Sequence, residues 1–149
     1  MLRLKLIFLV DDDTLLLPAY RRRFEQEVRN MDWGEPKPPS YAIYDCTSGQ
    51  AALDLMRVGL GLETTAPGTQ LEYFILSDGN MPGMDGDQFI RRAREMLGER
   101  VKTALLVSGK MSEFAEGAES VGYTLLQKPV EWKVLSGYLR SFLLPDAPT

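Results

Sequence analysis

Five short apolar segments divide the 149-residue sequence, and their pattern limits the possible folds more than any other feature. Four are short, mainly apolar runs of strand length: Leu4–Val10, Tyr73–Ser77, Ala104–Val107 and Tyr123–Leu126. Tyr41–Asp45 is a weaker fifth candidate. Runs without polar alternation are typical of parallel strands covered on both faces. The sequence therefore predicts a buried parallel sheet.

Helical patterns lie between these segments. In Asp87–Leu97, apolar residues recur every three or four positions and form one stripe. Three more helices are expected: Leu16–Val28 with Pro18 in its first turn, one capped by Ser48 and ending by Gly59 or Gly61, and Val134–Phe142. Strands and helices alternate five times, which predicts an α/β fold with helices on both faces of an open parallel sheet.

Two segments are expected to be surface loops longer than the usual connection. They are 31–40, which has three prolines, and 59–70, which has three glycines. Neither carries a repeat or a chemical motif. The length suits one domain over residues 1–149, with a core from about residue 4 to residue 144.

Composition excludes several classes of function. The net charge of -4, from 17 basic and 21 acidic residues, argues against a nucleic-acid groove binder. Without histidine the chain has no Ser-His or Cys-His nucleophile pair and lacks the usual zinc ligands. Cys46 is the single cysteine, so no intrachain disulfide can form, and Leu6–Val10 is too short for a signal or membrane segment. We expect a cytoplasmic location and no membrane partner.

Polar residues follow four of the predicted strands, where each strand ends. They are Asp11, Asp12 and Asp13 after the first strand, Asp78 after the third, Ser108 after the fourth and Lys128 after the fifth. In an open α/β sheet, ligands bind beyond the carboxyl ends of the strands, where the strand order reverses. We therefore expect these side chains to meet at one edge of the sheet.

This set of groups suits phosphoryl transfer. Crowded carboxylates repel one another, and a hard divalent cation such as Mg²⁺, with Mn²⁺ as an alternative, would relieve that repulsion. The cation would allow an aspartate to act as nucleophile, while a lysine and a hydroxyl hold the phosphoryl oxygens. Taken singly, each residue is more often structural: Asp13 alone suits a helix cap, and Ser108 with Gly109 suits a turn.

The segment from Asp78 to Gly86, Asp-Gly-Asn-Met-Pro-Gly-Met-Asp-Gly, resembles the phosphoacceptor segment of response-regulator receiver domains. Asp11–Asp13 resembles the acidic pair of that family, Val107–Gly109 its hydroxyl position and Gln127–Pro129 its Lys-Pro pair. These four motifs occur in the family's order and span nearly the whole chain. They imply a flavodoxin-like (βα)5 three-layer sandwich with strand order 2-1-3-4-5.

The resemblance also implies roles for individual residues. Asp78 would be phosphorylated, and Ser108 and Lys128 would contact the phosphoryl group. The metal ligands would be Asp12, the Asp78 carboxylate, the backbone carbonyl of Asn80 and, through a water, Asp11. The implied partners are a sensor histidine kinase or a histidine phosphotransfer protein, and a downstream protein or fused output domain. Such a module is not a conventional enzyme, although it can promote its own phosphorylation and dephosphorylation.

One position departs from the family pattern. Three residues before the lysine, where the family has an aromatic residue that moves on phosphorylation, this chain has Leu125. Tyr123 lies two residues earlier, on the same strand face but displaced by roughly 6–7 Å. We therefore predict that phosphorylation moves the loop 108–112 while the side chain of Leu125 changes little.

Two alternatives from other classes stay open. A haloacid-dehalogenase-like phosphatase also uses an aspartate, Mg²⁺, a hydroxyl and a lysine, but Leu15 stands where its first motif needs threonine. No acidic metal-binding motif follows Lys128 either. The second alternative is a receiver-like docking module that takes no phosphate. Such modules usually lack an acidic residue or the lysine, and this chain has both.

Overall fold

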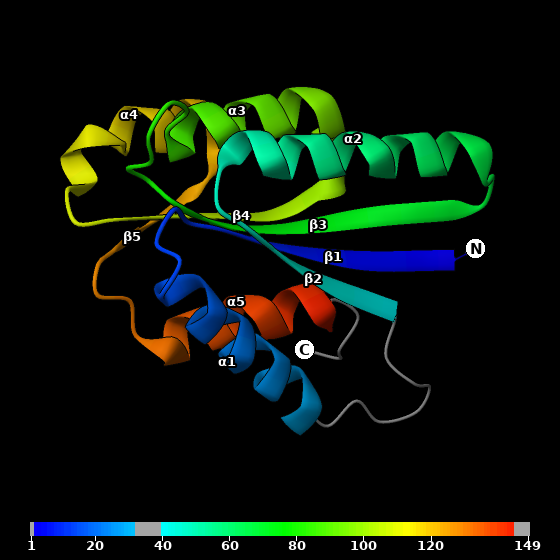
Figure 1. Ribbon diagram of the computed structural model, residues 1–149, viewed down its shortest axis with the longest axis horizontal. Helices are drawn as coiled ribbons and strands as arrows, with labels where there is room; N and C mark the ends of the chain where they lie inside the picture. Colours follow the sequence, from blue (N-terminus) through cyan, green and yellow to red (C-terminus); the bar gives the residue numbers. More distant parts are fainter. Residues whose placement is uncertain (1, 32–39, 145–149) are drawn as a thin grey trace.

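The computed structural model describes residues 2–31 and 40–144, which form a five-stranded parallel sheet with helices on both faces (Figure 1). The strand order is β2-β1-β3-β4-β5. The strands are β1 Leu2–Val10, β2 Ser40–Cys46, β3 Thr69–Asp78, β4 Val101–Ser108 and β5 Thr124–Gln127. The predicted flavodoxin-like (βα)5 sandwich with order 2-1-3-4-5 is confirmed.

Both faces of the sheet are buried, as the apolar runs predicted. Along β1, Phe8 and Val10 pack into the core under α2 and α3, while Ile7 and Leu9 pack into the core under α1 and α5. Because alternate side chains point to opposite faces of a strand, burial on both faces requires an unbroken apolar run. This explains why the strands show no polar alternation.

Helices α1 and α5 lie on one face of the sheet, and α2 and α3 lie on the other (Figure 1). Their bounds are α1 Leu16–Asn30, α2 Gly49–Thr65, α3 Gly86–Leu97 and α5 Trp132–Leu143. The hydroxyl of Ser48 caps α2 by accepting from the backbone N–H of Ala51 at 3.1 Å, as expected. Asp85 and Gln88 form a capping box on α3. None of the described helices is both long and apolar enough to cross a membrane.

The prediction of a long surface loop at 59–70 is wrong. Helix α2 continues through Gly59 and Gly61 to Thr65, and β3 begins at Thr69. Gly59 lies where the helix comes closest to the sheet. A Cβ atom there would be 2.6 Å from the hydroxyl oxygen of Tyr73 and 3.0 Å from Leu71 Cδ1. The glycine thus permits close packing, whereas the sequence suggested a helix end. Of the other expected loop, 31–40, residues 32–39 lie outside the described part of the chain.

The fourth helix of the expected alternation is short and irregular. Residues 111–122 form a 3-10 turn (Met111–Glu113), the three-residue helix α4 (Ala115–Gly117) and a π-helical turn (Ala118–Gly122). Glycines within so short a segment lower its helix propensity. The Tyr123 hydroxyl donates to Asp87 Oδ2 at 2.7 Å and lies 3.1 Å from the carbonyl oxygen of Phe114, and so ties this segment to α3. Hydrogen bonds of a side chain therefore hold this segment, in place of the regular backbone hydrogen bonds of a longer helix.

The two glycines of α2 provide a matched test of this packing. We expect Gly61→Ala to raise the free energy of unfolding by about 0.5–1 kcal/mol, because no atom lies within 4 Å of the new Cβ and alanine favours the helix. Gly59→Ala should instead destabilise the protein by about 1–3 kcal/mol, because Tyr73 and Leu71 are fully buried and cannot move aside. Urea unfolding measures both. Equal stabilisation by the two variants would contradict the packing described.

Candidate functional site

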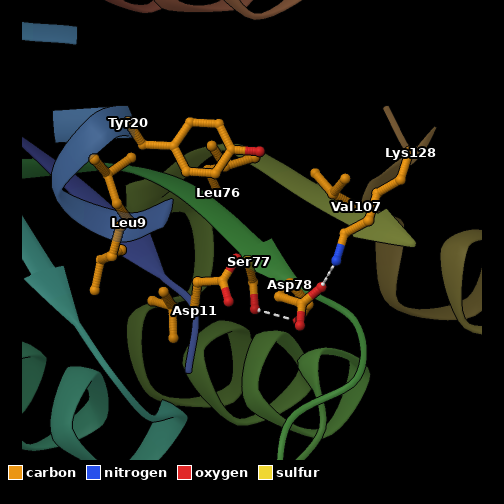
Figure 2. A pocket seen from close by; sticks show the side chains of 10 residues that line it. Leu9, Asp11, Tyr20, Leu76, Ser77, Asp78, Val107 and Lys128 are labelled. Carbon is orange, nitrogen blue, oxygen red and sulfur yellow. Dashed lines mark hydrogen bonds and ion pairs between the residues drawn. The ribbon is translucent and has the colours of Figure 1, made fainter. Parts of the chain in front are cut away.

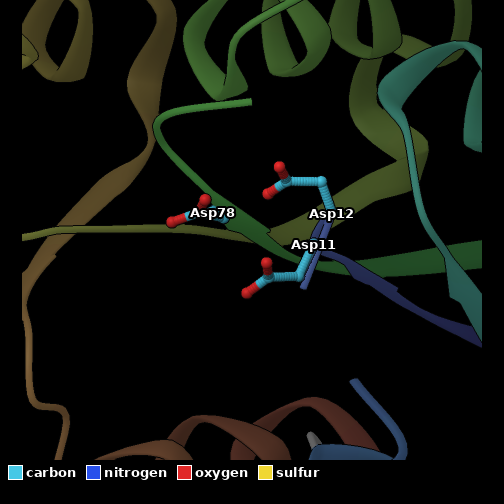
Figure 3. A group of neighbouring side chains, drawn as sticks. All are labelled: Asp11, Asp12 and Asp78. Atoms are coloured by element: carbon cyan, nitrogen blue, oxygen red, sulfur yellow. The ribbon is translucent and has the colours of Figure 1, made fainter. Parts of the chain in front are cut away.

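Three carboxylates meet at the carboxyl ends of β1 and β3, the strands between which the strand order reverses (Figure 3). Asp11 and Asp12 follow β1, and Asp78 is the last residue of β3. The two strands pair in register up to Val10 and Ser77, so the residues that follow are neighbours. One oxygen from each of the three carboxylates lies within 4.8 Å of the others. The expected meeting of these side chains at the switch point is confirmed.

Burial makes the negative charge of this acidic cluster costly. Asp11 and Asp78 are 6% and 7% exposed, while Asp12 is open to solvent. Burial raises the pKa of Asp11 above its ordinary value; the hydrogen bond from the backbone N–H of Asp13 opposes this rise, and the charge of Asp78 adds to it. Oxygen ligands packed this closely are the donor set that a hard divalent cation prefers. The three carboxylates therefore fit a metal ion.

Lys128 directly follows β5 and reaches the same carboxylate. Its ammonium lies 2.5 Å from Asp78 Oδ1 (Figure 2). Its backbone N–H donates to the carbonyl oxygen of Ser108 at 2.9 Å. Burial lowers the pKa of Lys128, but the hydrogen bond and charge of Asp78 outweigh it, so the net direction is upward. The lysine therefore stays charged and holds Asp78 in place.

Ser108 ends β4, next to this pair, and is fully buried. Its hydroxyl oxygen accepts a hydrogen bond from the backbone N–H of Lys110 at 2.9 Å. In this conformation the hydroxyl oxygen is thus directed to its own loop. Its expected contact with a phosphoryl group stays a prediction.

The loop after Asp78 is held closely against the sheet. The backbone N–H of Gly86 donates to the carbonyl oxygen of Gly79 at 2.8 Å, and a Cβ atom at Gly86 would lie 2.4 Å from the carbonyl oxygen of Asp78. Glycine is therefore required where α3 begins. Asn80 is exposed in this loop, and the role of its backbone carbonyl as a metal ligand stays a prediction.

Asp13 has the structural role that its position suggested. Its carboxylate accepts from the backbone N–H groups of Leu15 and Leu16, at 2.9 and 3.0 Å, where α1 begins. These N–H groups have no partner within the helix. Asp13 is thus engaged with the helix start, while Asp11 and Asp12 belong to the cluster.

Sequence reasoning missed Tyr20 as a site residue. Tyr20 lines a cavity of about 10 Å³ together with Asp11, Asp78 and Lys128 (Figure 2). Its pKa is raised, first by burial and then by the charge of Asp11. In the sequence, Leu16, Tyr20, Phe24 and Val28 recur every four residues, and this apolar spacing suggested that Tyr20 is a core residue. The one signal for a role in the site was its hydroxyl group, because the other three side chains are apolar. A cavity of this size has room for about one water molecule or a small ion.

Comparisons with known proteins agree with this architecture. No family model matches the sequence, and no curated protein is significantly similar to it. The receiver domain of the histidine kinase CKI1 from Arabidopsis thaliana, complexed with Mg²⁺ and BeF3⁻, is similar with a TM-score of 0.71 and 22% identity, over 93% of this chain and 89% of that one. A CheY-like receiver domain protein from Methanospirillum hungatei has a TM-score of 0.68 and 20% identity, over 94% of both chains. For the chemotaxis protein CheY4 of Vibrio cholerae the TM-score is 0.64 and the identity 22%, over 94% and 99%.

At these identities the similarity establishes the fold. The chain has the fold of response-regulator receiver domains, and the match spans more than nine tenths of its length. The resemblance suggested by the sequence motifs is thus confirmed at the level of architecture. The acidic cluster and Lys128 lie at the edge of the sheet where that fold binds its ligands.

The raised pKa of Asp11 leads to a prediction about stability and pH. We expect Asp11→Asn to raise the free energy of unfolding of the metal-free protein near neutral pH, because the ionised carboxylate is disfavoured in the folded state. The gain should vanish below about pH 4, where the carboxyl is protonated in both the folded and the unfolded state. Asparagine keeps the oxygen that accepts from the N–H of Asp13.

Denaturant unfolding with a chelator present, at neutral pH and at about pH 3.5, measures this difference. Asp54→Asn, on the exposed surface of α2, is the control and should show no such gain. An Asp11→Asn gain that stays constant as the pH falls would contradict the electrostatic explanation.

Proposed function

We propose that this chain is a phosphoacceptor receiver domain of a two-component or phosphorelay signalling system, and that it takes a phosphoryl group on Asp78. The observation that carries the proposal is the position of the Asp78 carboxylate. One side of it faces the Lys128 ammonium at 2.5 Å, and the other belongs to the cluster with Asp11 and Asp12. A nucleophilic oxygen between a cation and a metal-binding set is the arrangement that phosphoryl transfer needs.

In the proposed reaction, an oxygen of Asp78 forms a bond to phosphorus while the bond between phosphorus and the donor nitrogen breaks. The electron pair of that bond stays with the donor imidazole. Asp12, Asp78 and the backbone carbonyl of Asn80, with Asp11 acting through a water, would hold Mg²⁺ or Mn²⁺, which would supply positive charge for the phosphoryl oxygens. Lys128 would exchange part of its contact with Asp78 for a phosphoryl oxygen, and Ser108 would turn its hydroxyl toward another. The complex of the CKI1 receiver domain with Mg²⁺ and BeF3⁻ supports this assignment by analogy.

A groove beside the site offers a place for the phosphodonor. It has a volume of about 580 Å³, lies between α1 and the β5–α5 connection, and is lined largely by apolar side chains such as Leu16, Val130 and Trp132. Tyr20 and Lys128 line both this groove and the acidic site. A sensor histidine kinase or histidine phosphotransfer protein seated there would reach Asp78. In this proposal the chain acts as one receiver domain in the cytoplasm, and its output is a downstream protein or a fused domain.

The two alternatives fail on different grounds. A dehalogenase-like phosphatase needs a threonine where Leu15 stands and an acidic metal-binding motif after Lys128, and the sequence has neither. A docking module that takes no phosphate has no need of the ion pair between Lys128 and Asp78 or of the crowded carboxylates. The chain has both features, and they favour the proposal. Phosphorylation of the isolated domain decides between this alternative and the proposal.

We predict that a small phosphodonor such as acetyl phosphate, given with Mg²⁺, adds a single hydroxylamine-labile phosphoryl group. Asp78→Asn should abolish the label, because asparagine cannot form the acyl phosphate. Asp13→Asn is the matched control: that side chain contacts the start of α1, and the variant should still be labelled. Intact-protein mass spectrometry measures both. Labelling that survives in Asp78→Asn would overturn the assignment.

A second prediction concerns the metal. Mg²⁺ at about 100 times its dissociation constant should stabilise the wild-type fold by about 2.7 kcal/mol, seen as a rise in melting temperature. Asp12→Ala should lose that rise and, in a chelator, should be slightly more stable than wild type, because Asp11 and Asp78 lose a repelling neighbour. Asp54→Ala, on the surface of α2, should keep the full rise. An unchanged rise in Asp12→Ala would place the metal elsewhere.

Signal transmission in this chain should not depend on an aromatic residue at position 125. Leu125 is half-buried and packs against the same core as Tyr123 and Phe114, so these residues share one face of the sheet. Tyr123 is already hydrogen-bonded to Asp87 and to the Phe114 carbonyl. The expectation that the loop 108–112 moves while Leu125 stays in place remains a prediction, which NMR spectra with and without beryllofluoride would test.

A further inference from the structure

The residue that directly follows Asp78 is packed against the irregular segment 111–122. A Cβ atom at Gly79 would lie 2.7 Å from Cε2 of Phe114 and 3.0 Å from Leu106 Cδ2, so the ring of Phe114 rests on bare backbone. Phe114 is buried and belongs to the core under α2 and α3. A shift of the Gly79 backbone toward this ring is therefore blocked unless Phe114 moves with it.

A buried hydrogen bond fixes the end of this segment to α3. The Tyr123 hydroxyl, on the residue that follows the segment, donates to Asp87 Oδ2 at 2.7 Å, and Tyr123 is 6% exposed. Asp87 lies in the first turn of α3. That helix begins where the backbone N–H of Gly86 donates to the carbonyl oxygen of Gly79 at 2.8 Å. The segment and the loop that begins at Gly79 are thus joined at both of their ends.

Glycines let the segment lie directly on α3. A Cβ atom at Gly117 would lie 1.8 Å from Asp87 Oδ2 and 2.4 Å from the hydroxyl oxygen of Tyr123, so a side chain there would break the hydrogen bond between them. Further along α3, the guanidinium of Arg94 donates to the carbonyl oxygen of Gly122 at 2.5 Å. Figure 1 shows α4 on the same side of the sheet as α3. The middle and the end of the segment are therefore both held on α3.

The hydrogen bond between Tyr123 and Asp87 is of a strong kind. Burial raises the pKa of Tyr123 above its usual value, and the hydrogen bond to Asp87 raises it further, so the hydroxyl keeps its proton and remains a donor. The other carboxylate oxygen of Asp87 pairs with Arg91 at 3.2 Å, which fixes the acceptor in place. A bond to a charged acceptor, largely shielded from water, is stronger than one between neutral groups.

The proposed reaction requires the Ser108 hydroxyl to leave its place at the start of the same segment. Its oxygen accepts from the backbone N–H of Lys110 at 2.9 Å, and the carbonyl oxygen of Lys110 accepts from the backbone N–H of Glu113 at 3.2 Å. Turning the hydroxyl toward a phosphoryl oxygen would move this acceptor away from Lys110. The turn that leads to Phe114 would then lose a bond that holds it to β4.

We propose that the hydrogen bond between Tyr123 and Asp87 is a latch, which holds the segment 111–122 closed and so restrains phosphoryl transfer. The inference rests on the proposed function, because it concerns the regulation of the same site. While the latch is closed, Phe114 stays packed on the loop after the phosphoacceptor and Ser108 keeps its hydroxyl on its own loop. Phosphoryl transfer selects the open arrangement, so the closed latch lowers the fraction of molecules that are competent for it.

The rate of phosphorylation by acetyl phosphate with Mg²⁺ tests the latch. Tyr123→Phe removes the hydroxyl and keeps the ring, and it should be labelled roughly three to ten times faster than the wild type, because the competent fraction rises. Tyr41→Phe is the matched control, because Tyr41 is exposed on β2, the strand at the opposite edge of the sheet from β5. This control should be labelled at the wild-type rate. A rate for Tyr123→Phe that equals the wild-type rate or falls below it would overturn the proposal.

Amide hydrogen exchange separates the latch from the proposed function. In the unphosphorylated protein, the amides of 111–122 should exchange faster in Tyr123→Phe than in the wild type, while those of α1 keep the same rates, whether or not Asp78 is the phosphoacceptor. If the wild type is labelled but exchange in Tyr123→Phe is unchanged, the latch alone is refuted. If exchange is faster but the wild type is never labelled, the proposed function is refuted, and with it the role of the latch in phosphoryl transfer.

Discussion

The ion pair between Asp78 and Lys128 joins side chains fifty positions apart, and it forms only because β3, β4 and β5 pair in register. Each parallel strand must return to the same end of the sheet through a helix, so all five carboxyl ends lie along one edge. The helices that make these returns cover both faces and bury the apolar strands. The position of every functional side chain in the site depends on that parallel pairing.

The acidic cluster lowers the stability of the metal-free fold. Asp11 and Asp78 are buried beside each other, and burial raises the pKa of Asp11 because its charged form loses water. A single lysine offsets part of this cost at Asp78. The remaining repulsion favours a divalent cation, and in the proposed function that preference ties the site to the charge of a phosphoryl group.

Helix α2 packs closely on the sheet through a glycine in its interior. Gly59 lets the helix approach Tyr73 and Leu71, and the helix then continues to Thr65. A helix that ended at Gly59 would lose the turns that follow this close contact.

The sequence by itself determined the class of fold, the strand-end chemistry and the capping residues. Apolar runs, helical periodicity and caps such as Ser48 are local properties, and a local pattern is present in the chain before it folds. The motif around Asp78 carried the resemblance to receiver domains for the same reason. Strand bounds differed from the expected ones mainly at the amino-terminal ends, where β3 and β4 begin three or four residues earlier than their apolar runs.

The tertiary structure alone decided the features that depend on distant contacts. Gly59 lies in the interior of a helix, where that helix packs closely on Tyr73. Tyr20 lines the site because α1 packs beside Asp11 and Lys128. The irregular segment before β5 is held by the hydroxyl of Tyr123, whose partner Asp87 is 36 positions away. Residue type and spacing could not reveal these roles, because each is set by a neighbour that only the folded sheet brings within reach.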